Sequence, residues 1–266
     1  MTTKHPRLAQ LLKNDKDAYR LIDTHYKSDN FAKGRAFKAF FDEFCQNVFE
    51  TNLAMLQDLE LFPIAYSENN AYASIAHALH QLTPYAWSEA YINYKDKKSE
   101  NLGKAQSKDK WRFVDFWCMD SKKEFELWIE AKRLWLNIGK NSQWDFDSVA
   151  CERIKNALGQ IYNIKDAKPE QIADTSLKLA LFTIPVSCAI SQISEESDIK
   201  NAPKIVADLF ATFIDKRRNM GVLCGVLNLD PNFTLKDKML KNEAQGQIYT
   251  NEYTPYAILA AVVLGC

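Results

Sequence analysis

The sequence predicts an α/β protein in which helices flank a central mixed sheet, and three observations support this prediction. Helix-like and strand-like segments alternate in the order helices, three strands, helix, strand, helix and two strands. Residues 177–190 are almost entirely apolar, which is typical of a strand buried on both faces. Residues 111–133 have the pattern of two strands joined by a tight polar turn. Together these observations favour three layers, with the sheet between helices.

The chain of 266 residues is expected to form one elaborated domain, because this length is long for one simple domain and short for two. Residues 1–70 are expected to form a helical N-terminal layer, since large apolar residues such as Phe37 and Phe44 recur at helical spacing. Residues 71–190 hold the core of the sheet. Residues 191–266 extend that sheet.

The elements on the N-terminal side of the hairpin follow from local patterns. Residues 72–82 are expected to form a helix that ends before Pro84, because proline interrupts the helical hydrogen bonds. Residues 87–94 are rich in aromatic and β-branched side chains, which indicates a strand with its entry near Glu89.

The elements on the C-terminal side alternate in the same way. Asp147 or Ser148 can cap a helix whose apolar face includes Ile154 and Ile161. The apolar strand at 177–190 follows this helix. The later elements are a helix at 205–213 and strands at 221–229 and 256–265.

The charge of the chain is balanced, with 34 basic and 34 acidic residues. Because no global field attracts a polyanion, any nucleic-acid binding must come from a local patch. Residues 95–112 hold seven basic and three acidic residues and are expected to form a mobile loop. Phosphate contacts are expected from five of its side chains, namely Lys98, Lys104, Lys108, Lys110 and Arg112.

Several other functions lack their sequence signatures. Only eight glycines are present, and none forms a phosphate-binding loop or a dinucleotide fingerprint, so no nucleotide cofactor is expected. His77 and His80 share a helical face, but no glutamate completes a zinc hydrolase motif there. The remaining chemical candidate is the hairpin.

The cysteines and the chain ends favour a cytoplasmic location. The six cysteines are scattered without a close pair, which is typical of reduced thiols. The N-terminus is polar and lacks an apolar signal core. The apolar segment 256–266 is about half the length needed to cross a bilayer, so a buried strand is expected there and no membrane contact.

Two charged residues on the second strand of the hairpin must share a face. Glu130 and Lys132 are two residues apart, and side chains alternate across a strand. Whether Asp115 joins them depends on the register. If paired residue numbers sum to 243, a two-residue turn places Asp115 opposite Trp128 on the shared face, and a sum of 245 places it opposite Glu130. A sum of 244 turns Asp115 to the other face.

The chemistry of such a cluster suits a divalent cation. Two carboxylates, from Asp115 and Glu130, and a backbone carbonyl near Ala131 are oxygen ligands of the kind that Mg²⁺ prefers. Lys132 would orient a water molecule and stabilise negative charge on a phosphate. The alternative is that these charges simply pair with one another, and with Arg133, on a solvated sheet face.

These residues resemble the PD-(D/E)XK nuclease superfamily, which has the restriction-endonuclease-like fold. The matching motifs are Asp115 in Arg112-Phe-Val-Asp-Phe-Trp and the sequence Glu130-Ala-Lys132. A helix and a strand follow in the expected order, so the resemblance covers roughly residues 72–190. Val114 stands where the name-giving proline would be.

The resemblance implies a three-layer restriction-endonuclease-like core, with a central mixed sheet flanked by helices. A helical N-terminal layer and C-terminal strands are added to it here. It also implies an upstream acid near the first helix or strand, for which Glu89 is suitably placed.

The function expected from the resemblance is Mg²⁺-dependent or Mn²⁺-dependent hydrolysis of DNA phosphodiesters, in restriction, repair or mobile-element defence. Asp115, Glu130, Lys132 and Glu89 would form the catalytic group. RNA is the alternative substrate, and a homodimer that cuts both strands is an open option. The alternative function is a non-catalytic α/β protein-interaction module, which the balanced charge and numerous aromatic residues also favour.

Overall fold

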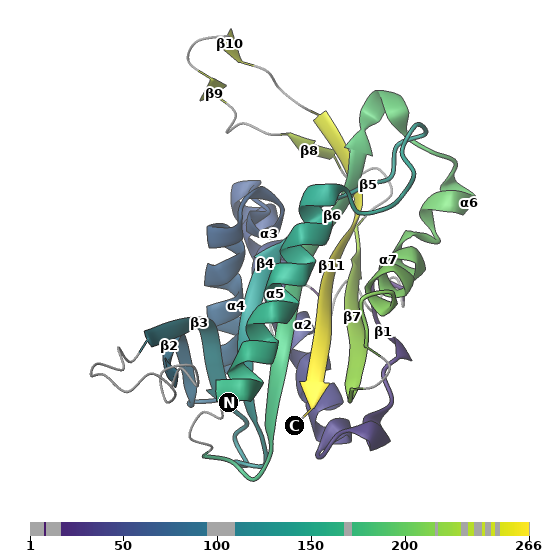
Figure 1. Cartoon of the computed structure of the whole chain (residues 1–266). Coiled ribbons are helices and arrows are strands. Elements are labelled where there is room, and N and C mark those ends of the chain that lie inside the picture. The colour runs from purple at the N-terminus through teal and green to yellow at the C-terminus, as the bar shows by residue number, and fades with distance from the viewer. Residues whose placement is uncertain are drawn as a thin grey trace.

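The computed structural model describes residues 8, 17–94, 110–167, 172–215, 218–229, 234–236, 241–242, 246–247 and 251–265. Within these ranges one nine-stranded sheet forms the centre of the molecule (Figure 1). The order across this sheet is β1 (Tyr19–His25), β7 (Met220–Asn228), β11 (Asn251–Gly265), β6 (Ser176–Ala189), β4 (Glu126–Arg133), β3 (Lys110–Met119) and β2 (Ala86–Tyr94).

Four short strands complete the inventory of described strands. Within the sheet, β5 (Leu136–Asn137) pairs with β6, and β8 (Thr234–Lys236) pairs with β11. A separate two-stranded sheet is formed by β9 (Lys241–Asn242) and β10 (Gly246–Gln247). Strands from near both ends of the described chain therefore meet in one sheet.

The central sheet is mixed, as predicted. The strands β2, β3 and β4 form an antiparallel meander, whereas β4 and β6 are parallel neighbours. Parallel neighbours need a long crossover, and the helix α5 (Ser148–Ala167) lies within it. The predicted α/β class is thus confirmed.

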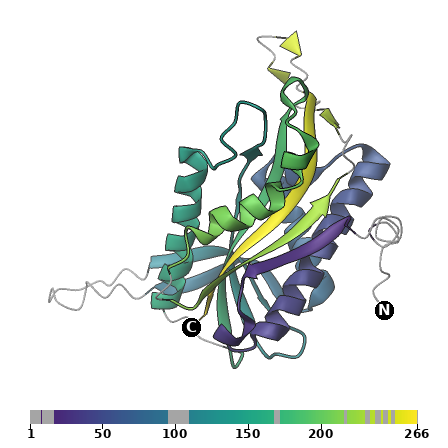
Figure 2. The same ribbon diagram turned by 90° about the vertical axis from the view of Figure 1, so that its right-hand side faces the viewer.

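Helices cover both faces of the sheet (Figure 2). One face packs against α2 (Gly34–Leu59), α3 (Pro63–Tyr66) and α4 (Glu68–Leu82), and the other against α5 and α7 (Ala202–Ala211). The short helix α6 (Glu196–Ile199) precedes α7. This layering is compatible with the predicted three-layer arrangement.

The alternation of side chains along β6 explains why two cores form. Leu179 and Leu181 pack in the cluster that contains Phe37 of α2, whereas Phe182 packs in the cluster that contains Ile154 of α5. A strand that is buried on both faces in this way needs an almost continuous apolar sequence. The prediction that this segment is a buried strand is confirmed.

The N-terminal layer differs from its prediction, because it contains a strand. β1 lies at the edge of the sheet and pairs antiparallel with β7, which a purely helical layer does not allow for. The helix α2 of this layer packs closely on β7. A Cβ added to Gly225 of β7 would lie 2.6 Å from the Cβ of Cys45 of α2. Glycine therefore lets α2 approach β7 at this position.

The hairpin between β3 and β4 has a four-residue turn, so the two-residue turn was wrong. The Asp120 N–H donates to the Phe125 carbonyl at 3.0 Å, and Lys123 takes a left-handed φ of 61° between them. The paired residues are Phe116 with Ile129 and Trp117 with Trp128. Their numbers sum to 245, which is the alternative register that aligns Asp115 with Glu130.

Two further expectations concern the environment of the chain. The cysteines in the described ranges, namely Cys45, Cys118, Cys151, Cys188 and Cys224, are all free thiols. No helix among the described residues is long and apolar enough to cross a membrane.

Candidate functional site

Strand β3 parts from β4 at Asp115. The ladder between the two strands ends at the pair Phe116 and Ile129. Val114 packs in the core beneath α5, whereas Phe116 packs in the core beneath α2 and α4, although side chains two apart normally share a face. The strand therefore turns over at Asp115. Beyond this point side chains replace the main-chain ladder.

The Asp115 carboxylate takes one of the vacated ladder positions. Its Oδ2 accepts a hydrogen bond of 2.7 Å from the Ala131 N–H of β4. Buried main-chain donors need a partner, and here a side chain supplies it. The contact fixes Asp115 next to Glu130 and Lys132, as the odd register sum predicts.

The Lys132 ammonium lies among four oxygen atoms. Its Nζ is 2.9 Å from the Ala131 carbonyl, 3.3 Å from Asp115 Oδ2, 3.8 Å from Glu68 Oε1 and 3.9 Å from Glu130 Oε2. The structure thus brings together four residues predicted to form the site, which are Asp115, Glu130, Ala131 and Lys132. It adds Glu68, which the sequence interpretation missed.

The cluster is largely removed from water. The Glu130 side chain is 2% exposed, and the side chains of Asp115 and Lys132 are about one fifth exposed. A solvated sheet face does not describe such a site, because burial of a charged group is costly unless it is paired or binds an ion. Arg133 is directed elsewhere: its guanidinium donates to the Ala65 carbonyl and lies 5.3 Å from the centre of the Trp135 ring.

Tyr72 of α4 contacts the same carbonyl as Lys132. Its hydroxyl donates to the Ala131 carbonyl at 2.8 Å and lies 3.4 Å from Glu68 Oε1. Burial, and after it the negative charges of Asp115, Glu68 and Glu130, raise the pKa of the Tyr72 phenol well above its ordinary value. The hydroxyl therefore stays protonated and acts as a donor at neutral pH.

Glu68 was missed because α4 begins earlier than predicted. The Ser67 hydroxyl accepts from the Asn70 N–H at 3.1 Å and caps the helix, so Glu68 lies in the first turn rather than in a loop. An acid in the first turn also suits the helix dipole. The pair Ser67-Glu68 before an apolar helical pattern was the available signal. Glu68 Oε2 further accepts from the Arg133 N–H at 3.3 Å.

Glu89 lies in register with Asp115, between the pairs Ser88 with Phe116 and Ala90 with Val114. It is exposed and has a left-handed φ of 53°, which marks an irregularity in β2 at the level where β3 turns over. Among the described residues no hydrogen bond or ion pair joins Glu89 to the cluster. Its role as the upstream acid stays a prediction, and Glu68 supplies the third carboxylate near Lys132.

The predicted phosphate contacts involve residues at the edge of what is described. Lys98, Lys104 and Lys108 lie outside the described residues. Lys110 and Arg112 lie on β3, but their side chains are outside the description. These five assignments remain predictions.

The donor set limits how a cation would be held. The described residues contain no group of three or more histidine, cysteine, aspartate or glutamate side chains arranged to hold a metal ion. A cation at this position would therefore use the carboxylates of Asp115 and Glu130, the Ala131 carbonyl and water. That set fits Mg²⁺, which prefers oxygen ligands and keeps several waters.

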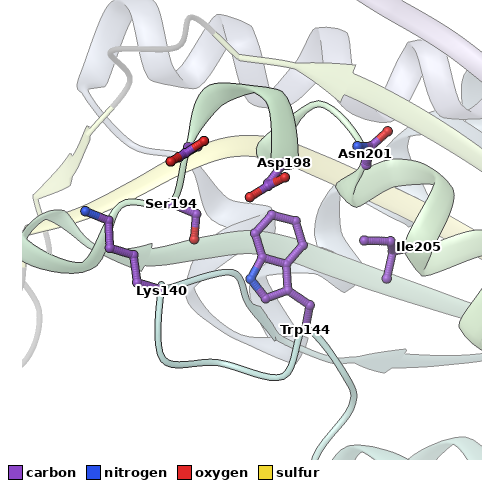
Figure 3. A pocket seen from close by; sticks show the side chains of 7 residues that line it. Lys140, Trp144, Ser194, Asp198, Asn201 and Ile205 are labelled. Atoms are coloured by element: carbon purple, nitrogen blue, oxygen red, sulfur yellow. The ribbon is translucent and has the colours of Figure 1, made fainter.

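A cavity of about 470 Å³ lies away from this cluster, between the loop after β5 and the start of α7 (Figure 3). Trp144 and Lys140, both on the loop after β5, line the cavity together with Asp198 and Glu195. Figure 3 shows Asp198 near the Trp144 ring. Two carboxylates make this cavity unsuited to a phosphate backbone. None of the residues that line it belongs to the cluster around Lys132, so the cavity is separate from the candidate site.

Comparisons with known proteins give no match: no family model, no curated protein and no solved structure matches this chain. The functional argument consequently depends on the cluster itself.

Proposed function

We propose that this chain is a Mg²⁺-dependent nuclease that hydrolyses DNA phosphodiester bonds on a restriction-endonuclease-like core. The observation that carries the proposal is the set of four oxygens within 4 Å of one cationic atom, Lys132 Nζ, at the point where β3 parts from β4. The order α4, β2–β3–β4, α5 and β6 supports the proposal, because it is the element order of the PD-(D/E)XK nuclease superfamily that the motifs resemble.

The residues of the cluster have different roles in the proposed reaction. Asp115, Glu130 and the Ala131 carbonyl would hold the cation. When bound, Mg²⁺ would supply Lewis-acid stabilisation of the phosphate and promote ionisation of a water molecule. Lys132 would orient the attacking water and stabilise the negative charge that develops on the phosphate. Buried Glu130 and the largely buried Asp115 keep these groups in one geometry, which lowers the cost of reorganisation during the reaction.

The surroundings of the cluster favour a cation over a purely structural ion pair. Three carboxylates, of Asp115, Glu130 and Glu68, lie within 4 Å of a single ammonium. A hard divalent cation would balance this excess of negative charge better than one ammonium does. Free thiols in the described ranges also suit the cytoplasm, where DNA substrates of a defence or repair nuclease are found.

Cleavage assays test the proposal directly. We expect the purified chain to cut plasmid or single-stranded DNA with Mg²⁺ or Mn²⁺ and to be inactive with EDTA. Asp115→Asn and Glu130→Gln should each lower the rate at least a hundredfold, because each removes a ligand charge. The control Glu124→Gln, on the turn of the same hairpin and paired with Lys33 at 3.2 Å, should retain full activity.

Two results would overturn the proposal. One is the absence of cleavage of DNA and RNA by a folded wild-type chain under all metal conditions, which would favour the non-catalytic interaction module. The other is cleavage that persists undiminished in both Asp115→Asn and Glu130→Gln. Sedimentation of the chain with and without duplex DNA would establish whether a homodimer forms.

A further inference from the structure

We infer that Tyr72 is a positioning residue of the candidate site, holding the Ala131 carbonyl so that its oxygen can serve as a cation ligand. This inference deepens the proposed function and rests on it. The hydroxyl is 2.8 Å from the Ala131 carbonyl oxygen and comes from a different layer of the fold, since α4 packs on the face of the sheet opposite α5.

The Ala131 carbonyl needs such a partner because β3 has left it. On a continuous ladder this carbonyl and the Ala131 N–H would both bond to β3, but the ladder ends at Phe116 and Ile129. The N–H is instead bonded by Asp115, and the carbonyl accepts from Tyr72 and Lys132. Tyr72 therefore replaces part of the missing strand.

A bound cation would affect the two donors to the Ala131 carbonyl, Tyr72 and Lys132, in different ways. Lys132 is positively charged, so a divalent cation at the same oxygens would repel its ammonium. The Tyr72 hydroxyl is neutral and can stay. A carbonyl oxygen has two lone pairs, so the Ala131 oxygen can accept from Tyr72 with one and, once Lys132 is displaced, bind a cation with the other.

The Tyr72 ring is held independently of its hydroxyl. It packs edge-on against Phe116 with the ring centres 5.4 Å apart. Tyr72 also lies one helical turn after Glu68, so both side chains leave the same face of α4 toward β4. Removal of the hydroxyl alone should consequently leave the ring in place and release the Ala131 carbonyl, together with the longer contact of 3.4 Å to Glu68 Oε1.

The test compares Tyr72→Phe with the matched control Tyr162→Phe. Tyr162 lies on α5, in the opposite layer, and its hydroxyl is 3.1 Å from the sulfur of Met220 on β7. Mn²⁺ binding is measured by electron paramagnetic resonance without substrate, and cleavage is measured across Mn²⁺ concentrations. We expect Tyr72→Phe to weaken Mn²⁺ binding about fivefold, the change that corresponds to one net hydrogen bond of about 1 kcal/mol. The Mn²⁺ concentration for half-maximal cleavage should rise equally, while the rate at saturating Mn²⁺ and the melting temperature of the metal-free chain stay near wild type.

The outcomes separate this inference from the proposed function. Unchanged Mn²⁺ affinity in Tyr72→Phe, alongside clear binding by the wild type, would overturn the role of Tyr72 alone. A large loss of rate at saturating Mn²⁺ with unchanged affinity would overturn it too, because the hydroxyl would then act on the reacting groups. If the wild type bound no Mn²⁺, the proposed function itself would fall.

Discussion

Replacement of Lys132 by methionine should tighten cation binding and abolish cleavage at the same time. The ammonium occupies the oxygens that a cation would use, with contacts of 2.9 Å to the Ala131 carbonyl and 3.3 Å to Asp115. A hydrogen bond to a charged group contributes about 1.5 to 3 kcal/mol, and that amount must be given up when a cation displaces the ammonium. At 1.4 kcal/mol per tenfold, its removal corresponds to about a ten- to hundredfold gain in affinity.

Solvent screening places the expectation near the lower end of this range. The Lys132 side chain is 20% exposed, so its interactions are weaker than those of a fully buried charge. We therefore expect the Mn²⁺ dissociation constant of Lys132→Met to fall about tenfold. Methionine keeps a long apolar stem, which limits the loss of packing.

The assay for this prediction is a Mn²⁺ titration of wild type, Lys132→Met and the control Lys200→Met, with plasmid cleavage measured in parallel. Lys200 directly follows α6, is exposed and pairs with Glu196 at 2.8 Å, so its replacement should change neither property. Mn²⁺ binding by Lys132→Met that is equal to or weaker than wild type would refute competition between the ammonium and the cation. Cleavage by this variant at the wild-type rate would refute a role for Lys132 in the reaction.

Two further predictions concern stability. Asp120→Ala should lower the free energy of unfolding by about 2 to 3 kcal/mol in urea denaturation, because the Asp120 carboxylate accepts from the N–H groups of Lys122, Glu124 and Phe125 in the hairpin turn; a loss below 0.5 kcal/mol would contradict this role. The Lys204 hydrogen bond, and then that of His25, lower the pKa of Asp208, so the folded state gains stability that is present above pH 4 and is lost as the pH falls through the lowered pKa. Asp208→Asn should remove this part of the acid dependence of the melting temperature, and an unchanged profile between pH 5 and pH 2 would refute it.

Local sequence patterns were sufficient to predict most strands of the central sheet. The apolar run of β6 predicted its central position, because few other environments accept so many adjacent apolar side chains. The alternation of side chains along a strand left two registers that bring Asp115, Glu130 and Lys132 to one face and one register that does not. The choice between the two favourable registers depends on the length of the turn. The Asp120 side chain closes a four-residue turn, and nothing in a simple two-residue pattern indicates this.

The features that the sequence did not predict are β1, Glu68 and the contact of Tyr72. They depend on contacts between distant parts of the chain. β1 is held by pairing with β7, more than 190 residues later, so its own short sequence gives little indication of a strand. Glu68 depends on the exact start of α4, and helix ends are the least certain feature of a periodic pattern. Tyr72 matters only because β3 departs from β4, which no local pattern reveals.

The position of Asp115 in the vacated ladder constrains residue 115 in two independent ways. Its oxygen completes the main-chain bonding of β4 through the Ala131 N–H, whether or not any cation binds. Only aspartate and asparagine place an acceptor at that reach from the backbone, so a descendant of this protein that no longer needed catalysis would still keep one of them there. Lys132 also serves the main chain, because its ammonium donates to the Ala131 carbonyl at 2.9 Å. The bond to the Ala131 N–H accepts either aspartate or asparagine, but a cation ligand needs the negative charge. In related chains an aspartate rather than an asparagine at position 115 would therefore mark retained cation binding.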